Sequence, residues 1–111
     1  MPFDFGDILL LPFPFTDQTA SKKCPAAVVS SRAYYSARRN VVVVAITSQL
    51  HPDPAAGEAW VKDWKLAGFL KPSAVKPVFA TIEQGLVIRK LGVLSDTDKE
   101  SLTRLIAKML G

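Results

Sequence analysis

A chain of 111 residues has the usual size of one domain, and its length leaves no room for a second core. A single cysteine excludes an internal disulfide, fits a reducing compartment and, with one histidine, cannot form a clustered metal site. The net charge of +4 predicts an anionic partner, either nucleic acid or an acidic peptide, with a solvated basic face as the alternative.

The first half of the chain predicts three short strands. A strand over 7–11 ends at Pro12, because proline cannot donate to a strand ladder. A loop rich in turn-forming residues separates it from a second strand over 25–31. The polar stretch 32–40 reads as irregular, with one helical turn as the alternative. The unbroken apolar run within 41–47 predicts a strand that is buried on both faces, in the middle of a barrel.

The second half predicts three more strands, over 59–64, 74–82 and 86–94. In the first of them, Trp60, Lys62 and Trp64 share one face, because side chains alternate along a strand. In the last, the alternation fails at Arg89 and Lys90, which predicts a bulge or an edge position.

An amphipathic helix is the final predicted element. Ser95 is the expected N-cap, and Asp98 three residues later gives a short form of the capping box. The apolar residues at 102, 105, 106, 109 and 110 form one stripe at helical spacing. Several short strands followed by one helix predict a mainly β protein, a small β-barrel capped by a C-terminal α-helix, with residues 1–111 as a single domain.

The basic residues are concentrated in two stretches without acids. Five lie between Asp17 and Asp53, and three more lie between Asp63 and Glu83. Because these stretches flank predicted strands and do not form a tail, we favour a bound anion over a solvated face.

We expect a cytoplasmic protein that does not enter a membrane. The apolar start carries Asp4 and Asp7 and lacks a basic region, so it does not read as a signal peptide. The longest purely apolar run, 41–46, is too short to span a bilayer.

Few residues suggest catalysis by themselves. Cys24 and His51 could form a nucleophile pair activated by the neighbouring lysines, but the chain has no other feature of a cysteine hydrolase. The other polar group of interest closes the third predicted strand and consists of Thr47, Ser48 and Gln49. These side chains either cap the strand end or line a site on the rim of the barrel.

Four segments, in this order and spacing, resemble the MazF/PemK family of toxins from type II toxin–antitoxin modules. They read GDILLLPFPFTD, KKCPAAVVSS, VVVVAITSQ and LKPSAVKP with the following TIEQGLVIRKLGVLS. The resemblance runs from Gly6 to the final helix, and the stretch 63–73 is similar to the PemK-like branch. It implies an SH3-like β-barrel with a C-terminal helix, usually as a homodimer.

The resemblance also implies an activity and partners. Family members are typically endoribonucleases that cut single-stranded RNA at short sequences without a metal ion or other cofactor. A small, partly disordered, acidic antitoxin covers their site. The expected partners of this chain are therefore single-stranded RNA, an acidic antitoxin and a second copy of itself.

The catalytic residues that the resemblance implies include one departure from the family. Thr47 matches the Thr or Ser that the family places at the end of the third strand. Cys24 stands where the family keeps an Arg just before the Pro of the second strand. Lys22 or Lys23 would then supply the cation, although Lys23 faces away from Cys24 if it already lies in the strand. The expected RNA-binding residues are Ser48, Gln49, Lys71, Lys76 and Glu83.

Three functions remain open from the sequence. The first is a ribonuclease toxin, slowed by Cys24, and the second is a toxin-like protein that binds RNA or antitoxin without cutting. The third function is that of a gyrase poison, which no residue of this chain specifically favours. We favour the ribonuclease toxin.

A second departure from the family lies at Ala80. Many relatives carry a further Arg at this position, although the PemK-like branch often lacks it.

Overall fold

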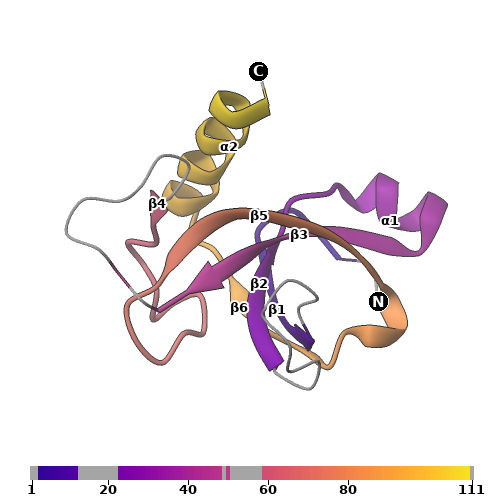
Figure 1. Ribbon diagram of the computed structural model, residues 1–111, viewed down its shortest axis with the longest axis horizontal. Coiled ribbons are helices and arrows are strands. Elements are labelled where there is room, and N and C mark those ends of the chain that lie inside the picture. Colours follow the sequence, from indigo (N-terminus) through magenta and orange to yellow (C-terminus); the bar gives the residue numbers. More distant parts are fainter. Residues whose placement is uncertain (1–2, 13–22, 49, 51–58, 111) are drawn as a thin grey trace.

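The computed structural model describes residues 3–12, 23–48, 50 and 59–110. The fold is mainly β with a C-terminal helix, as predicted (Figure 1). In chain order the elements are β1 (Asp7–Pro12), β2 (Lys23–Val28), α1 (Arg32–Arg38), β3 (Asn40–Thr47), β4 (Ala59–Trp60), β5 (Ala74–Glu83), the 3-10 helix η1 (Gln84–Leu86), β6 (Arg89–Val93) and α2 (Asp96–Leu110).

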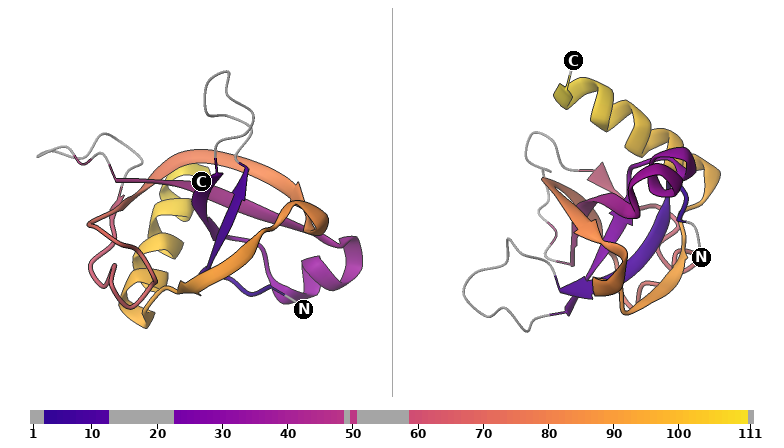
Figure 2. Two further views of the ribbon diagram at one scale, coloured as in Figure 1. Left: turned by 90° about the horizontal axis from the view of Figure 1, so that it is seen from below. Right: turned by 90° about the vertical axis from the view of Figure 1, so that its right-hand side faces the viewer.

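The strands form one antiparallel sheet in the order β4-β5-β3-β2-β1-β6. Figure 2 shows that the sheet is strongly curled into a half-barrel, with α1 and α2 at opposite ends of it. β3 lies inside the sheet, between β2 and β5, and its Val41, Val43 and Val44 are fully buried. The interior position predicted for this strand is therefore confirmed.

Two apolar clusters cover the two faces of the sheet. One contains Ile8, Val44 and Leu102, so α2 packs over it. The other contains Val43 and Tyr35, so α1 packs over it. Because neighbouring residues of β3 belong to different clusters, this strand is held from both sides.

The broken alternation of the last strand predicts a bulge or an edge position, and the strand has both. β6 is an edge strand of the sheet. Its pairing with β1 shifts between Ile8, opposite Gly92, and Leu9, opposite Lys90, which leaves Leu91 as an extra residue in a bulge.

Several predicted boundaries are wrong. The second strand begins at Lys23 and ends at Val28, not over 25–31. The stretch predicted as irregular contains the seven-residue helix α1, whose N-cap Ser31 accepts a hydrogen bond from the N–H of Tyr34. The strand predicted from 86 starts only at Arg89, because Leu86 is the last residue of the 3-10 helix η1.

The strand predicted over 59–64 is wrong in most of its length. β4 ends at Trp60, and residues 62–68 form consecutive turns. The amides of Lys62 and Asp63 donate to the carboxylate of Asp98, each over 2.9 Å, and so do not join a ladder. The chain then reverses, with the N–H of Ala67 donating to the carbonyl of Asp63. A bond to a distant residue thus overrides the strand-like pattern.

This turn lies directly against the edge strand β6. A Cβ atom on Gly68 would lie 2.4 Å from the carbonyl oxygen of Leu91, and one on Gly92 would lie 2.3 Å from that of Ala67. Gly68 also has a φ of +93°, a conformation that favours glycine. Two glycines therefore allow the backbones of the turn and of β6 to touch.

The helix α2 begins as predicted. The hydroxyl of Ser95 accepts a hydrogen bond from the N–H of Asp98 at 3.2 Å, which is the expected N-cap contact. The apolar stripe is covered at Leu102 and half-covered at Leu105 and Ile106, whereas Leu110 remains 71% exposed. The far end of the helix thus presents an apolar surface to solvent.

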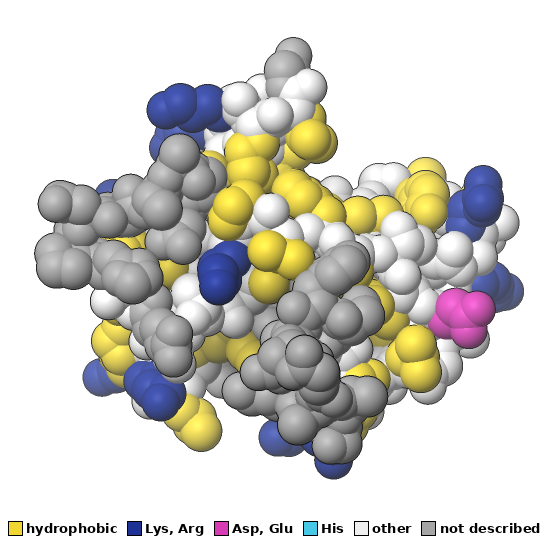
Figure 3. Space-filling view, in the orientation of Figure 1, with side chains coloured by type: hydrophobic (Ala, Val, Ile, Leu, Met, Phe, Trp, Pro, Cys, Tyr) yellow, Lys and Arg dark blue, Asp and Glu magenta, His cyan; other side chains and the backbone are white. Residues whose placement is uncertain are grey.

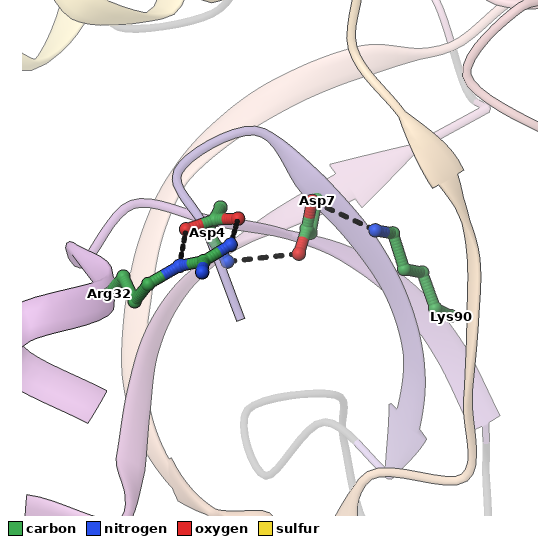
Figure 4. Close-up of polar contacts among 4 residues, drawn as sticks. All are labelled: Asp4, Asp7, Arg32 and Lys90. Carbon is green, nitrogen blue, oxygen red and sulfur yellow. Dashed lines mark hydrogen bonds and ion pairs between the residues drawn. The ribbon is translucent and has the colours of Figure 1, made fainter. Parts of the chain in front are cut away.

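A chain of charged groups holds the N-terminal segment between α1 and β6 (Figure 4). The carboxylate of Asp4 accepts two hydrogen bonds from Arg32, at 2.8 and 2.6 Å. The buried carboxylate of Asp7 accepts the N–H of Asp4 at 2.9 Å and lies 3.3 Å from the ammonium of Lys90. One backbone segment thereby links the helix to the edge strand.

The hydrogen bond from Arg32 holds the pKa of the Asp4 carboxyl below its ordinary value of 3.8. Because the folded state favours the charged carboxylate, this pair stabilises the fold above that ordinary value. The contribution is lost as the pH falls through the lowered pKa. Both side chains are well exposed, so solvent screens the interaction.

Replacing Asp98 by Ala should lower the free energy of unfolding by about 2–4 kcal/mol, because it leaves the amides of Lys62 and Asp63 without their acceptor and removes the carboxylate that accepts a hydrogen bond from the hydroxyl of Ser95. Chemical denaturation followed by circular dichroism measures the change. Asp96→Ala is the matched control, since Asp96 lies in the same helical turn but is exposed. Equal losses in the two variants would contradict this role of Asp98.

Candidate functional site

Cys24 and Thr47 lie at the ends of two neighbouring strands. The last pair between β2 and β3 is Ala26 with Ala45. Cys24 precedes this pair by two residues on β2, and Thr47 follows it by two residues on β3. Since opposed residues share a face and every second residue returns to it, Cys24 and Thr47 project to the same face. Beyond the pair the strands diverge (Figure 1).

Trp60 and Lys76 lie on the same face, as the strand pairings of β5 show. Thr47 is opposite Ala74 on β5, and Ala74 is opposite Trp60 on β4. With neighbouring strands about 5 Å apart, Trp60 lies about 10 Å from Thr47, measured between Cα atoms. Lys76 follows Ala74 by two residues and is exposed. We call Cys24, Thr47, Trp60 and Lys76 the strand-end face.

A bulge in β5 is located beside this face. The register with β3 shifts between Val44, opposite Phe79, and Ile46, opposite Val75. Ala45 therefore faces a stretch of three residues that begins at Lys76. Bulges of this kind redirect side chains and are frequent beside functional sites. This bulge was not predicted, although a proline at 77 inside a strand is a sequence signal for it.

Cys24 is half-buried and packs against the apolar cluster under α1. It is opposite Leu11 on β1, inside a regular ladder. Its packing is that of a small apolar residue at the beginning of a strand, and its thiol brings no positive charge to the strand-end face.

Lys23 is exposed and is the first residue of β2, opposite Pro12. Because it already lies in the strand, alternation directs it to the face opposite that of Cys24. Lys22, Gln49 and His51 lie outside the described residues.

The other expected RNA-binding residues divide into two groups. Ser48 directly follows Thr47 and is exposed. Lys71 is exposed three residues before β5, and its carbonyl accepts a hydrogen bond from the hydroxyl of Ser73 at 2.9 Å. Glu83, in contrast, is opposite Asn40 at the other end of β3. Seven residues of strand separate Asn40 from Thr47, about 23 Å, so one chain does not bring Glu83 to the strand-end face.

The sequence analysis also missed Trp60 as a candidate binding residue. Its side chain is 45% exposed, which is unusual for so large an apolar group. The sequence offered only a weak signal, with Lys62 two residues after Trp60 and acidic residues at 58 and 63, and the pattern was interpreted as a strand face. An exposed indole beside lysines can stack on a nucleic-acid base.

Figure 3 shows how the types of side chain are distributed over one face of the molecule. Hydrophobic side chains extend across its middle, basic side chains are distributed around them, and acidic ones are confined to the edge near α1. Within the described residues, no three His, Cys, Asp or Glu side chains lie close enough to hold a metal ion. No helix in that part of the chain is long and apolar enough to cross a membrane.

The same fold occurs in solved toxin structures. An endoribonuclease from a mycobacterial species in complex with its cognate antitoxin is 15% identical, with a TM-score of 0.78, covering 98% of this chain and 95% of its own. The toxin MazF-mt6 of Mycobacterium tuberculosis is 21% identical, with a TM-score of 0.73, covering 92% and 93%. MazF from Deinococcus radiodurans is 16% identical, with a TM-score of 0.76, covering 100% and 98%.

Identities this low establish the fold alone, and no curated protein matches the chain. The family assignment comes from the sequence itself. The family described as the PemK-like, MazF-like toxin of type II toxin–antitoxin systems matches residues 4–110. This chain therefore belongs to the PemK-like, MazF-like toxins of type II toxin–antitoxin systems.

Proposed function

We propose that this toxin is an endoribonuclease that cuts single-stranded RNA at short sequences without a metal ion. The observation that carries the proposal is the shared face of Cys24 and Thr47 at the diverging ends of β2 and β3. These are the two positions at which the family resemblance expects catalytic groups. Membership of the family over residues 4–110 supports the reaction class.

The reaction is a transfer of the phosphate within the RNA. The ribose 2′-hydroxyl attacks the adjacent phosphorus, negative charge grows on the phosphorus oxygens, and the 5′-oxygen leaves. A protein cation and a hydroxyl that donates a hydrogen bond can stabilise that charge without a metal. Thr47 is the hydroxyl of the proposed site, and Lys76 is the cation on the same face.

The missing arginine sets the expected rate. Lys76 offers a point charge and not the planar fork with which a guanidinium binds two oxygens. Lys23 has the weaker geometric support, because its side chain projects to the opposite face. We therefore expect slower cleavage than an arginine at position 24 would give.

A second function has one specific observation in its favour. Cys24 packs on the apolar cluster and carries no charge, which suits a protein that binds RNA or antitoxin without cutting. The two functions differ only in catalysis, so an RNA cleavage assay separates them.

An acidic antitoxin is the proposed regulatory partner. Similar structures include a mycobacterial endoribonuclease with its cognate antitoxin and MazE–MazF assemblies from Deinococcus radiodurans. The net charge of +4 on this chain suits an acidic partner.

Cys24→Arg should raise the rate of RNA cleavage, because it places a fixed cation where charge develops on the phosphate. A single such donor is typically worth about 3–4 kcal/mol, a factor of a hundred to a thousand. Thr47→Ala should abolish cleavage. Gel analysis of a long single-stranded RNA in EDTA measures both effects.

Two control variants accompany this experiment. Ser36→Arg adds the same charge on exposed α1, and Thr81→Ala removes an exposed hydroxyl elsewhere on β5. Neither should change the rate. If the wild-type protein and Cys24→Arg cut at the same rate, the assignment of the arginine position to Cys24 is wrong. If neither cuts, the binding function replaces the enzymatic one.

Trp60→Ala should weaken binding of single-stranded RNA about tenfold, because stacking of one base on an aromatic ring is worth about 1–3 kcal/mol. Trp60→Phe keeps a stacking surface and should retain most of the affinity. Fluorescence anisotropy with a labelled RNA measures both affinities. Equal losses in the two variants, or none in either, would remove Trp60 from the binding face.

The toxin should be a homodimer at micromolar concentration. Six large apolar side chains are at least 45% exposed among the described residues, including Leu110 at the end of α2, and a dimer would cover part of this surface. Size-exclusion chromatography with light scattering gives the mass directly. A mass near 12.1 kDa at high concentration would show a monomer and contradict the expectation.

A further inference from the structure

The turn before β5 carries the two most exposed large apolar side chains of the described residues. Leu70 is 97% exposed and Leu66 is 74% exposed. Single exposed leucines are ordinary on protein surfaces and need no explanation. These two are four residues apart, so their Cα atoms lie at most about 14 Å from each other. One bound segment can therefore contact both side chains.

Lysines flank the two leucines on both sides. Exposed Lys65 directly precedes Leu66, and exposed Lys71 directly follows Leu70. The ammonium of Lys65 lies 5.4 Å from the centre of the Trp64 ring. Figure 3 shows basic and hydrophobic side chains next to each other at its lower left, over this segment, without acidic ones. We call Lys65, Leu66, Leu70 and Lys71 the basic-leucine tip.

The backbone below the tip is fixed. Ala67 and Phe69, which lie between the two leucines in sequence, are buried. The N–H of Phe69 donates to the carbonyl of Trp64 at 3.1 Å, and Gly68 touches the backbone of Leu91. A surface held in this way loses little conformational freedom when a partner binds, which favours affinity.

We propose that the basic-leucine tip is the docking surface for an acidic segment of the antitoxin with apolar side chains at intervals. The apolar side chains would cover Leu66 and Leu70, and the carboxylates would pair with Lys65 and Lys71. Charge complementarity identifies the acidic partner. This inference rests on the proposed function, because that function requires an antitoxin.

RNA is the less suitable occupant of this surface. Specific RNA recognition uses aromatic or guanidinium planes to stack on bases and polar groups to bind base edges. The leucine side chain provides neither. Covering two aliphatic side chains instead removes apolar area from water, which is the dominant favourable term in protein association.

The location of the tip gives it a regulatory consequence. Lys71 lies three residues before Ala74, whose strand partner is Thr47. An acidic segment bound at the tip would neutralise Lys71 at the border of the strand-end face. It would thereby compete with the RNA backbone for that cation.

A synthetic peptide tests this docking surface. The probe is a fluorescein-labelled peptide of 16 residues, made of leucine and glutamate in amphipathic order, on the order of 25–50 Å long depending on its conformation. Its affinity for the full chain is measured by anisotropy. Leu66→Ser combined with Leu70→Ser should weaken binding at least tenfold. Leu86→Ser, an exposed leucine on η1, is the matched control and should leave binding unchanged.

A second peptide and an RNA assay complete the test. A peptide with serine in place of leucine should not bind, and Lys71→Gln should weaken binding of the leucine peptide. The double leucine variant should cut RNA at the wild-type rate. Matching thermal unfolding of the double variant and wild type establishes that the fold is intact.

The outcomes separate the docking surface from the proposed function. Absence of peptide binding, or equal binding to the wild type and the double variant, overturns the docking surface even if RNA is cut. Loss of RNA affinity in the double variant, in parallel with peptide affinity, assigns the tip to RNA and also overturns it. Leucine-dependent peptide binding without any RNA cleavage supports the docking surface while the enzymatic function fails.

Discussion

The buried carboxylate of Asp98 is the contact on which the arrangement of this toxin depends. It accepts the amides of Lys62 and Asp63, each at 2.9 Å, while its own amide is capped by Ser95. One side chain thereby joins the beginning of α2 to the turn that leads into β5. Because a buried carboxylate needs such donors, the turn and the helix are fixed together. Along the chain, Trp60 of the strand-end face and Lys65 of the basic-leucine tip lie on either side of this joint.

Short sequence patterns predicted those elements of the fold that depend on contacts between residues close together in the sequence. Ser95 with Asp98 and the apolar stripe predicted α2, and the broken alternation at Arg89 predicted a bulge or an edge position for β6, which has both. The turn over 62–68 could not be predicted in this way. The alternation of Trp60 and its neighbours resembles that of a strand, and the bond that ends it comes from Asp98, 36 residues away from Lys62.

The candidate site was partly predictable for the same reason. The polar residues that end a buried apolar run are visible in the sequence, and the family resemblance singled out Thr47 among them. Whether it shares a face with Cys24 depends on the pairing of Ala26 with Ala45, and the distance to Glu83 depends on the register of β3 with β5. Registers are set by the packing of whole strands and not by single residues. Trp60 lies on the strand-end face because it pairs with Ala74 of β5, and the spacing of residues in the sequence does not reveal that pairing.

The central claim is that Thr47 and a nearby cation assist attack by the ribose 2′-hydroxyl, with no metal in the reaction. An RNA with a single 2′-deoxynucleotide on the 5′ side of the cut, compared in EDTA with the all-ribose RNA, tests it most directly. The account predicts that the ribose strand is cut, that its 5′ fragment ends in a cyclic phosphate, and that the deoxy-substituted strand stays intact at that position. Equal cutting of both strands, or cutting that EDTA abolishes, would contradict the account.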